Sequence, residues 1–245
     1  MTTTKNPNKT IAIFGAGTGL GVSLAARFGR EGYRVALVAR GAAALQDRVA
    51  ELARAGIEAV AFPADLAKLE GIAALVRSIE ERLGSIDVAV YSPVPSGVGF
   101  VPAVELDAAK LQALASVFAF APVEVAHAVL PGMLARGDGA IVVVGGLTAV
   151  VTMPGMSGVG PLMAAARNYV FTLNAEVMSK GVFACTVNIG AMIERSAGYR
   201  AMTAGGAKLD PRFPVINPDD IAQEIWTLVA KRDRVEVILP PLASP

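Results

Sequence analysis

The sequence predicts a single-domain α/β protein built on a doubly wound parallel sheet of about seven strands. Short apolar runs alternate with helical patterns along all 245 residues, which is typical of repeated βαβ units. Apolar residues make up 53% of the chain and charged residues 18%, so helices can cover both faces of such a sheet with apolar side chains.

The expected elements follow one another in regular order. Strands are expected at 11–14, 35–38, 59–62, 88–91, 140–144, 182–187 and 235–239. Helical patterns lie between them near 19–31, 42–55, 68–83, 105–135, 160–180 and 218–231. Pro218 after Asn217 predicts a helix start, and Gly181 predicts a helix end.

One segment, 191–215, breaks this alternation. Five turn-forming residues interrupt it, namely Gly198, Gly205, Gly206, Pro211 and Pro214. Long connections of this kind in compact domains are usually functional. We therefore expect a flexible lid near 191–215 within one domain that spans residues 1–245.

Composition argues against several classes of function. The net charge is +1 and no basic block is present, so we expect no nucleic-acid partner and no membrane partner. The polar start, Met1 to Lys9, has no apolar segment typical of secretion, and we expect a cytoplasmic protein. The uncharged stretch 139–166 contains six glycines and two prolines, which argues against a lipid-spanning helix.

The single cysteine limits redox and metal chemistry. Cys185 excludes an intramolecular disulfide framework and a cysteine zinc cluster, and we expect no metal. It lies in the apolar run 182–189, so we expect a buried small hydrophobe, with a reactive thiol as the minor alternative.

The first expected strand leads into a glycine-rich turn that opens a helix. The turn reads Gly15-Ala16-Gly17-Thr18-Gly19-Leu20-Gly21. Glycines here let backbone N–H groups at a helix start approach a pyrophosphate. The strand–turn–helix context is what a Rossmann-like dinucleotide site requires, and a glycine-rich turn without a ligand is the alternative.

The end of the second strand indicates which dinucleotide binds. An acidic residue there would bind the ribose 2′-hydroxyl of NAD, but Ala39 takes that place and Arg40 follows. A guanidinium suits a 2′-phosphate. The sequence therefore favours NADP(H), with an ordinary surface charge as the alternative for Arg40.

The spacing Gly-x3-Gly-x-Gly resembles that of the short-chain dehydrogenase/reductase family, and the resemblance runs from Ile11 to about Leu239. Further matches are Leu130-Pro131-Gly132-Met133 to the end of the family's long interface helix, 139–144 to its fifth strand, and Val187-Asn188-Ile189-Gly190 to its Asn-Pro-Gly turn. The resemblance implies that Asp65 and Leu66 bind adenine, with a helix cap as the alternative for Asp65. It also places Gly15, Gly17, Thr18, Gly19, Leu20, Ser92 and Gly190 at the cofactor.

In the register set by these matches, the family's catalytic positions carry no polar side chain. The family's Asn, Ser, Tyr and Lys fall on Phe118, Gly146, Val159 and Met163. The loss does not depend on the register, because none of the four tyrosines is followed by lysine four residues later. General acid–base help is worth roughly 10²–10⁴ in rate, and these apolar residues cannot supply it.

Substitute proton donors are few. Tyr91, Ser92, Thr148, Ser157 and Glu194 are candidates to line the pocket. Glu194 is the leading one, because a carboxyl beside an apolar wall can remain protonated and act as an acid. The alternative is a solvated charge that pairs with Arg195 or with nothing. The single histidine, His127, is expected at an interface or in the core.

Three functions remain open. The first is an NADP(H)-dependent oxidoreductase with a non-standard site, in which Met153, Met156, Val159 and Met163 suit an apolar small-molecule substrate. The second is a non-catalytic cofactor-binding subunit or sensor. The third is an isomerase or cyclase on the same scaffold. Because the segment 105–136 is more apolar than one sheet face requires, we also expect a homotetramer or homodimer.

Overall fold

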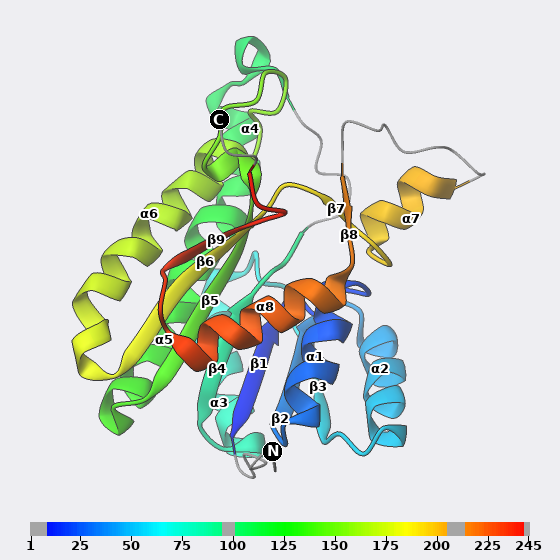
Figure 1. Ribbon diagram of the computed structural model, residues 1–245, viewed down its shortest axis with the longest axis vertical. Coiled ribbons are helices and arrows are strands. Elements are labelled where there is room, and N and C mark those ends of the chain that lie inside the picture. Colours follow the sequence, from blue (N-terminus) through cyan, green and yellow to red (C-terminus); the bar gives the residue numbers. More distant parts are fainter. Residues whose placement is uncertain (1–8, 95–100, 205–213, 243–245) are drawn as a thin grey trace.

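The computed structural model describes residues 9–94, 101–204 and 214–242, and it confirms the doubly wound parallel sheet. Seven parallel strands follow the order β3-β2-β1-β4-β5-β6-β9 (Figure 1). Their bounds are β1 Thr10–Phe14, β2 Arg34–Ala39, β3 Ala59–Pro63, β4 Ile86–Tyr91, β5 Gly139–Gly146, β6 Val182–Ile189 and β9 Glu236–Leu239. The strand order reverses between β1 and β4, so a crevice is expected at their carboxyl ends.

Helices cover both faces of this sheet. Their bounds are α1 Leu20–Arg30, α2 Ala42–Arg54, α3 Ile72–Leu83, α4 Ala108–Ala115, α5 Ala121–Arg136, α6 Gly160–Val177, α7 Ala197–Thr203 and α8 Pro218–Lys231. One apolar cluster joins α1, α2 and α8 to the sheet, and a second joins α3, α5 and α6 (Figure 1). Alternate strand side chains enter the two clusters, which explains why the strands are apolar on both faces.

The local signals near residues 181–218 are confirmed. Asn217 precedes α8, and its side chain accepts a hydrogen bond from Asp219 N at 2.9 Å. Gly181 has φ +84, and a Cβ at this position would lie 1.9 Å from Gly137 O, so only glycine fits. Cys185 is fully buried, and burial raises the pKa of its thiol to about 12, so it is the expected inert hydrophobe.

The single helix expected near 105–135 is interrupted. A 3-10 turn at Ala103–Glu105 precedes α4, and a π-helical turn at Ser116–Phe120 separates α4 from α5. Pro122 lies in the first turn of α5 and has no N–H to donate to the carbonyl four residues earlier. The missing donor explains the local change of helix type, which is a common feature near functional sites.

Two further expectations need correction or completion. The helix expected from residue 68 begins with a 3-10 turn at Leu69–Gly71, and α3 follows from Ile72. In the segment 191–215, β7 at Met192–Ile193 pairs in parallel with β8 at Val215–Ile216, and α7 lies between them. Residues 205–213 lie outside the described residues, so the flexible lid stays a prediction.

The uncharged stretch 139–166 does not form a membrane-spanning helix, because it contains β5, a 3-10 turn and only the start of α6. A different helical run, Ala108–Arg136, is long and apolar enough to cross a membrane by length and composition, and 39% of its most apolar window is buried. Core helices of soluble proteins pass the same test, so one such helix is weak evidence.

Candidate cofactor and catalytic site

The glycine-rich turn lies at the carboxyl end of β1 and packs against the end of β4. Gly15 has φ +95, and a Cβ on it would lie 2.4 Å from Pro93 N. A Cβ on Gly21 would lie 2.7 Å from Ala16 C. Both positions therefore require glycine for steric reasons, and the turn holds its backbone close to the sheet.

The start of α1 offers free backbone donors. Gly19 gives no side-chain cap, and the first turn of α1 contains no acidic residue. The first N–H groups of a helix have no intrahelical acceptor, and the helix dipole favours an anion there. Nearby, Ser92 Oγ is buried without a hydrogen-bond partner among the described residues. The backbone N–H groups at the start of α1 fit a dinucleotide pyrophosphate.

Two arginines flank the turn. Arg40 follows β2 and is exposed, as a 2′-phosphate contact requires. Arg48 of α2 donates a hydrogen bond to the carbonyl of Ala16 inside the turn. Burial, together with nearby Arg200, lowers the pKa of Arg48. No sequence motif indicated Arg48, because its position depends on how α2 packs.

The other predicted cofactor residues differ in which of their polar groups remain available to a ligand. Asp65 Oδ1 accepts a hydrogen bond from Ala67 N at 3.1 Å and does not cap a helix, so that alternative was wrong. The side chain of Leu66 is buried, which leaves only its backbone for a ligand. Gly190 N–H donates to Leu239 O at 2.7 Å, so only its carbonyl remains free.

The positions matched to the family's catalytic residues are packed together. Phe118 lies in the π-helical turn and Val159 just before α6, and both are buried. Gly146 N–H donates to Met163 Sδ at 3.2 Å. The methionine therefore occupies the space beside the end of β5, where a serine side chain would point.

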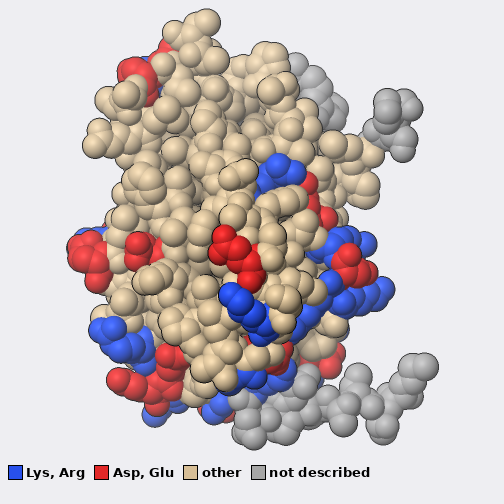
Figure 2. All heavy atoms as spheres, turned by 90° about the vertical axis from the view of Figure 1, so that its left-hand side faces the viewer, with Lys and Arg blue, Asp and Glu red and all other residues tan. Residues whose placement is uncertain are grey.

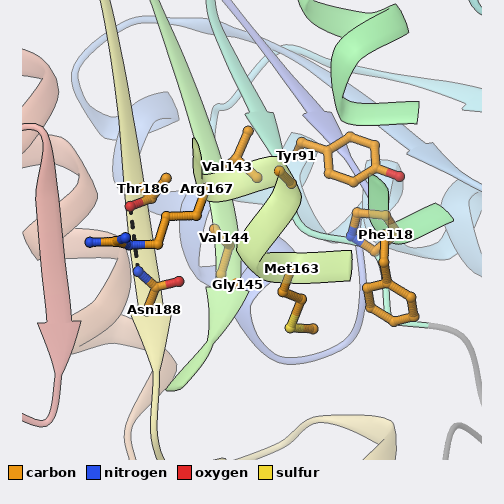
Figure 3. Close-up of a pocket in the computed structure, with 11 residues that line it drawn as sticks. Tyr91, Phe118, Val143, Val144, Gly145, Met163, Arg167, Thr186 and Asn188 are labelled. Atoms are coloured by element: carbon orange, nitrogen blue, oxygen red, sulfur yellow. Dashed lines mark hydrogen bonds between the residues drawn. The ribbon is translucent and has the colours of Figure 1, made fainter. Parts of the chain in front are cut away.

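A small cavity lies beneath α6 (Figure 3). It measures about 20 Å³, room for one water-sized group. Its walls are Tyr91, Pro93, Phe118, Val143, Val144, Gly145, Met163, Ala166, Arg167, Thr186 and Asn188. Of the four residues expected to line an apolar substrate pocket, Met163 lines this cavity and Val159 is buried, and the pocket itself stays a prediction.

A polar network closes one end of this cavity. Arg167 Nε and Nη2 donate to the Glu236 carboxylate at 2.5 and 2.7 Å, and Asn188 Nδ2 donates to Glu236 Oε1 at 2.8 Å. Thr186 Oγ1 also donates to Glu236 Oε1, at 3.2 Å. The hydrogen bond from Arg167 holds the pKa of Glu236 below its ordinary value. The sequence indicated Asn188 only as part of a turn.

The network fixes the orientation of the Asn188 amide. Its nitrogen points toward Thr186 and its oxygen toward Gly145 (Figure 3). A Cβ on Gly145 would lie 2.6 Å from Asn188 Oδ1. Glycine at 145 therefore makes room for the amide oxygen, which remains an acceptor facing the cavity.

The substitute proton donors are placed as follows. The Tyr91 hydroxyl donates to Val117 O at 2.6 Å, and burial raises its pKa, so it keeps its proton. Thr148 and Ser157 are half-buried in the connection between β5 and α6. Glu194 is half-buried at the end of β7.

Two alternatives from the sequence are corrected here. Arg195 pairs with Asp219 at 2.8 Å, so the pairing considered between Glu194 and Arg195 was wrong. His127 is exposed on α5, so it is not a core residue of this chain. Its place at an interface stays a prediction.

Comparison with known proteins agrees with this geometry. The short chain dehydrogenase family matches residues 9–198. The 2-(S)-hydroxypropyl-CoM dehydrogenase 3 of Xanthobacter autotrophicus is 28% identical over 234 residues, covering 91% of this chain and 90% of its own. The dehydrogenase/reductase SDR family member 7B of Bos taurus is 27% identical over 249 residues, covering 97% and 75%.

Solved structures share the fold. A metagenomic short-chain oxidoreductase in complex with NADP has a TM-score of 0.78 and 25% identity, covering 97% of this chain and 99% of its own. L-Sorbose reductase from Gluconobacter frateurii has a TM-score of 0.84 and 24% identity, covering 96% of each chain. With the matched family spanning most of the described sheet, the chain belongs to the short-chain dehydrogenase family.

Proposed function

We propose that this chain is an NADP(H)-binding oxidoreductase with a non-standard active site and an apolar small-molecule substrate. The observation that carries the proposal is the glycine-rich turn. Gly15 and Gly21 are sterically required, and the start of α1 presents uncapped N–H groups beside them. A helix start without a side-chain cap, behind glycines that are sterically required, is the arrangement that binds a pyrophosphate.

The choice of NADP(H) rests on the cations beside the turn. Arg40 is free of ion pairs among the described residues, and Arg48 brings a second guanidinium to the carbonyl of Ala16. The structurally similar metagenomic oxidoreductase was crystallised with NADP. When bound, the nicotinamide would donate or accept the hydride.

The chemistry proposed for the substrate follows from the apolar catalytic end. Gly146, Val159 and Met163 hold no proton donor, and the Tyr91 hydroxyl is committed to Val117 O. An activated acceptor, such as a conjugated alkene or an iminium ion, needs less protonation than a ketone. Such acceptors are therefore the proposed substrate class, with Glu194 as the proposed donor where one is needed.

The test is to follow NADPH oxidation with matched panels of ketones, conjugated enones and imines. We expect turnover only with the activated acceptors and a reduced rate in Glu194→Gln. Glu81→Gln is the matched control, because Glu81 is an exposed carboxylate at the end of α3. Ketone reduction at ordinary rates, unchanged in Glu194→Gln, would contradict the proposed site.

A specific observation favours a second function, a non-catalytic cofactor-binding subunit or sensor. The Met163 sulfur is packed against the Gly146 N–H, and the adjoining cavity is only about 20 Å³. A substrate would have to displace Met163 to reach this space. NADPH binding without turnover of any acceptor, in the parent chain and in Met163→Ala, would favour this function.

We also propose a cytoplasmic homotetramer or homodimer without nucleic-acid or membrane partners. The face that carries α6 is almost free of charged side chains in its upper part (Figure 2). Phe120, between α4 and α5, is 53% exposed, which is unusual for a large apolar side chain. We expect a dimeric or tetrameric mass by light scattering at micromolar concentration. A monomer would contradict the proposal.

A further inference from the structure

Arg195 adopts a backbone conformation that is unfavourable for its residue type. Its φ is +62, in the left-handed region that side chains with a Cβ rarely adopt. Such a conformation persists only where surrounding contacts determine it, and these contacts tend to gather at functional sites. The contacts of Arg195 are therefore worth following on both its backbone and its side chain.

The backbone of Arg195 lies directly on the glycine-rich turn. Thr18 Oγ1 donates to Arg195 O at 2.9 Å, and Arg200 Nη2 donates to the same oxygen at 2.7 Å. A Cβ on Gly19 would lie 3.0 Å from Glu194 O and 3.1 Å from Ser196 N. The segment 194–196 therefore covers the turn at the residue that precedes α1.

The side chain of Arg195 ties the same segment to two helices. Its Nη2 lies 3.3 Å from Ser23 Oγ of α1, 3.1 Å from Asn217 Oδ1 and 2.8 Å from Asp219 Oδ2. Asn217 caps α8, and Asp219 lies in its first turn. One residue thus joins the glycine-rich turn, α1 and the start of α8.

These bonds are of a kind that breaks readily. The side chains of Arg195 and Asp219 are 53% and 59% exposed. Exposed ion pairs contribute little and exchange with water. The contacts of Arg195 hold the segment 194–196 in one position. Because each contact is weak, the segment can also open often, which suits a reversible closure.

We propose that Arg195 is a latch: it holds the segment 194–196 on the glycine-rich turn and limits the rates at which the dinucleotide binds and leaves. The inference rests on the proposed NADP(H) binding, because the covered helix start is the proposed pyrophosphate site. A bound dinucleotide would lie beside this segment at the start of α1, where the same bonds can close over it. The latch must open for binding and for release alike, so it changes both rates and leaves the affinity nearly constant.

The test measures both rate constants by stopped-flow NADPH fluorescence. In Arg195→Ala we expect binding and release to speed up together, each about three- to tenfold, with Kd changed less than about twofold. Arg195→Gly removes the same guanidinium but tolerates the positive φ. It should therefore speed the rates less than Arg195→Ala does. Asp219→Asn, which keeps Arg195 and removes only the ion pair, should give a smaller rise.

Three outcomes would overturn the proposal. A lower melting temperature with unchanged rates would give Arg195 a structural role only. Faster release alone, with a weaker Kd that depends on salt, would make Arg195 a phosphate contact and not a latch. A decrease of either rate in Arg195→Ala would also contradict it.

A second measurement separates failure of the latch from failure of the proposed function. Hydrogen exchange of the Glu194 and Ser196 amides can be followed in the ligand-free protein. We expect faster exchange in Arg195→Ala than in the parent chain. If the parent binds no NADPH, the proposed function fails. The exchange rates then still decide whether Arg195 holds the segment closed, and unchanged exchange rejects the latch.

Discussion

The cofactor end and the catalytic end, both at the carboxyl ends of the strands, differ in which side chains they require. At the cofactor end, β1 and α1 keep a turn in which Gly15 and Gly21 cannot carry a side chain. At the catalytic end, β5, β6 and α6 present Gly146, Met163 and a polar network centred on Glu236. Both ends belong to one sheet and one family.

The difference shows that the requirements of cofactor binding and of proton transfer are independent. Backbone geometry alone holds a pyrophosphate, so the cofactor end depends on glycines and on a helix start. Proton transfer needs particular side chains, and neither the sheet nor the two apolar clusters depend on them. The following experiments test that separation.

Gly15→Ala should give the largest effect. The new Cβ would overlap Pro93 N at 2.4 Å and force an unfavourable φ of +95 on alanine. We expect roughly 3 kcal/mol of lost stability and loss of measurable NADPH binding. Urea denaturation and calorimetry measure the two effects. Gly71→Ala is the control, because nothing lies within 4 Å of its Cβ position, and an equal loss there would contradict the steric argument.

Asn188→Leu tests the catalytic end. Leucine has a similar size but leaves Glu236 without the 2.8 Å hydrogen bond from Asn188. We expect about 2–3 kcal/mol of lost stability, since a buried polar network is broken, and unchanged NADPH affinity. Thr186→Val, which removes only the longer contacts, should cost less. A large change in Kd would show that the two ends are coupled.

Arg40→Asp tests the choice between NADP(H) and NAD(H) at the cofactor end alone. Replacing a phosphate partner by a hydroxyl acceptor should shift the NADP(H)-to-NAD(H) affinity ratio about 10- to 100-fold and reverse the preference. Arg54→Asp, at the exposed far end of α2, makes the same charge change away from the crevice and should leave the ratio unchanged. Equal affinity of the parent chain for both cofactors would refute the role of Arg40.

The smallest expected effect is a pH dependence at Glu236. Arg167 lowers the pKa of the Glu236 carboxyl, so the ionised carboxylate stabilises the fold at pH values above 4.5, the ordinary pKa of a glutamate. That contribution is lost as the pH falls through the lower pKa of the folded state. The stability gap between the parent and Glu236→Gln should therefore be constant near pH 7 and narrow below 4.5. A gap that widens in acid would contradict this sign.

Most of the sheet could be predicted from the sequence, because strand periodicity and glycine signals are local. The breaks near Ser116–Phe120 could not, since they depend on Pro122 and on the Tyr91 hydroxyl reaching Val117 O. At the site, Gly15 and Arg40 could be predicted as cofactor residues because each follows the end of a strand. Arg48 and Glu236 were missed because their contacts join elements distant in sequence.

The contact between Met163 and Gly146 couples two positions that lie 17 residues apart in the sequence. A Cβ on Gly146 would lie 3.3 Å from Met163 Sδ, so a serine there requires the methionine to move. Lysine at 163 in turn would lose the N–H···S contact with Gly146. The two positions are therefore expected to be epistatic: the effect of a side chain at 146 depends on which residue stands at 163.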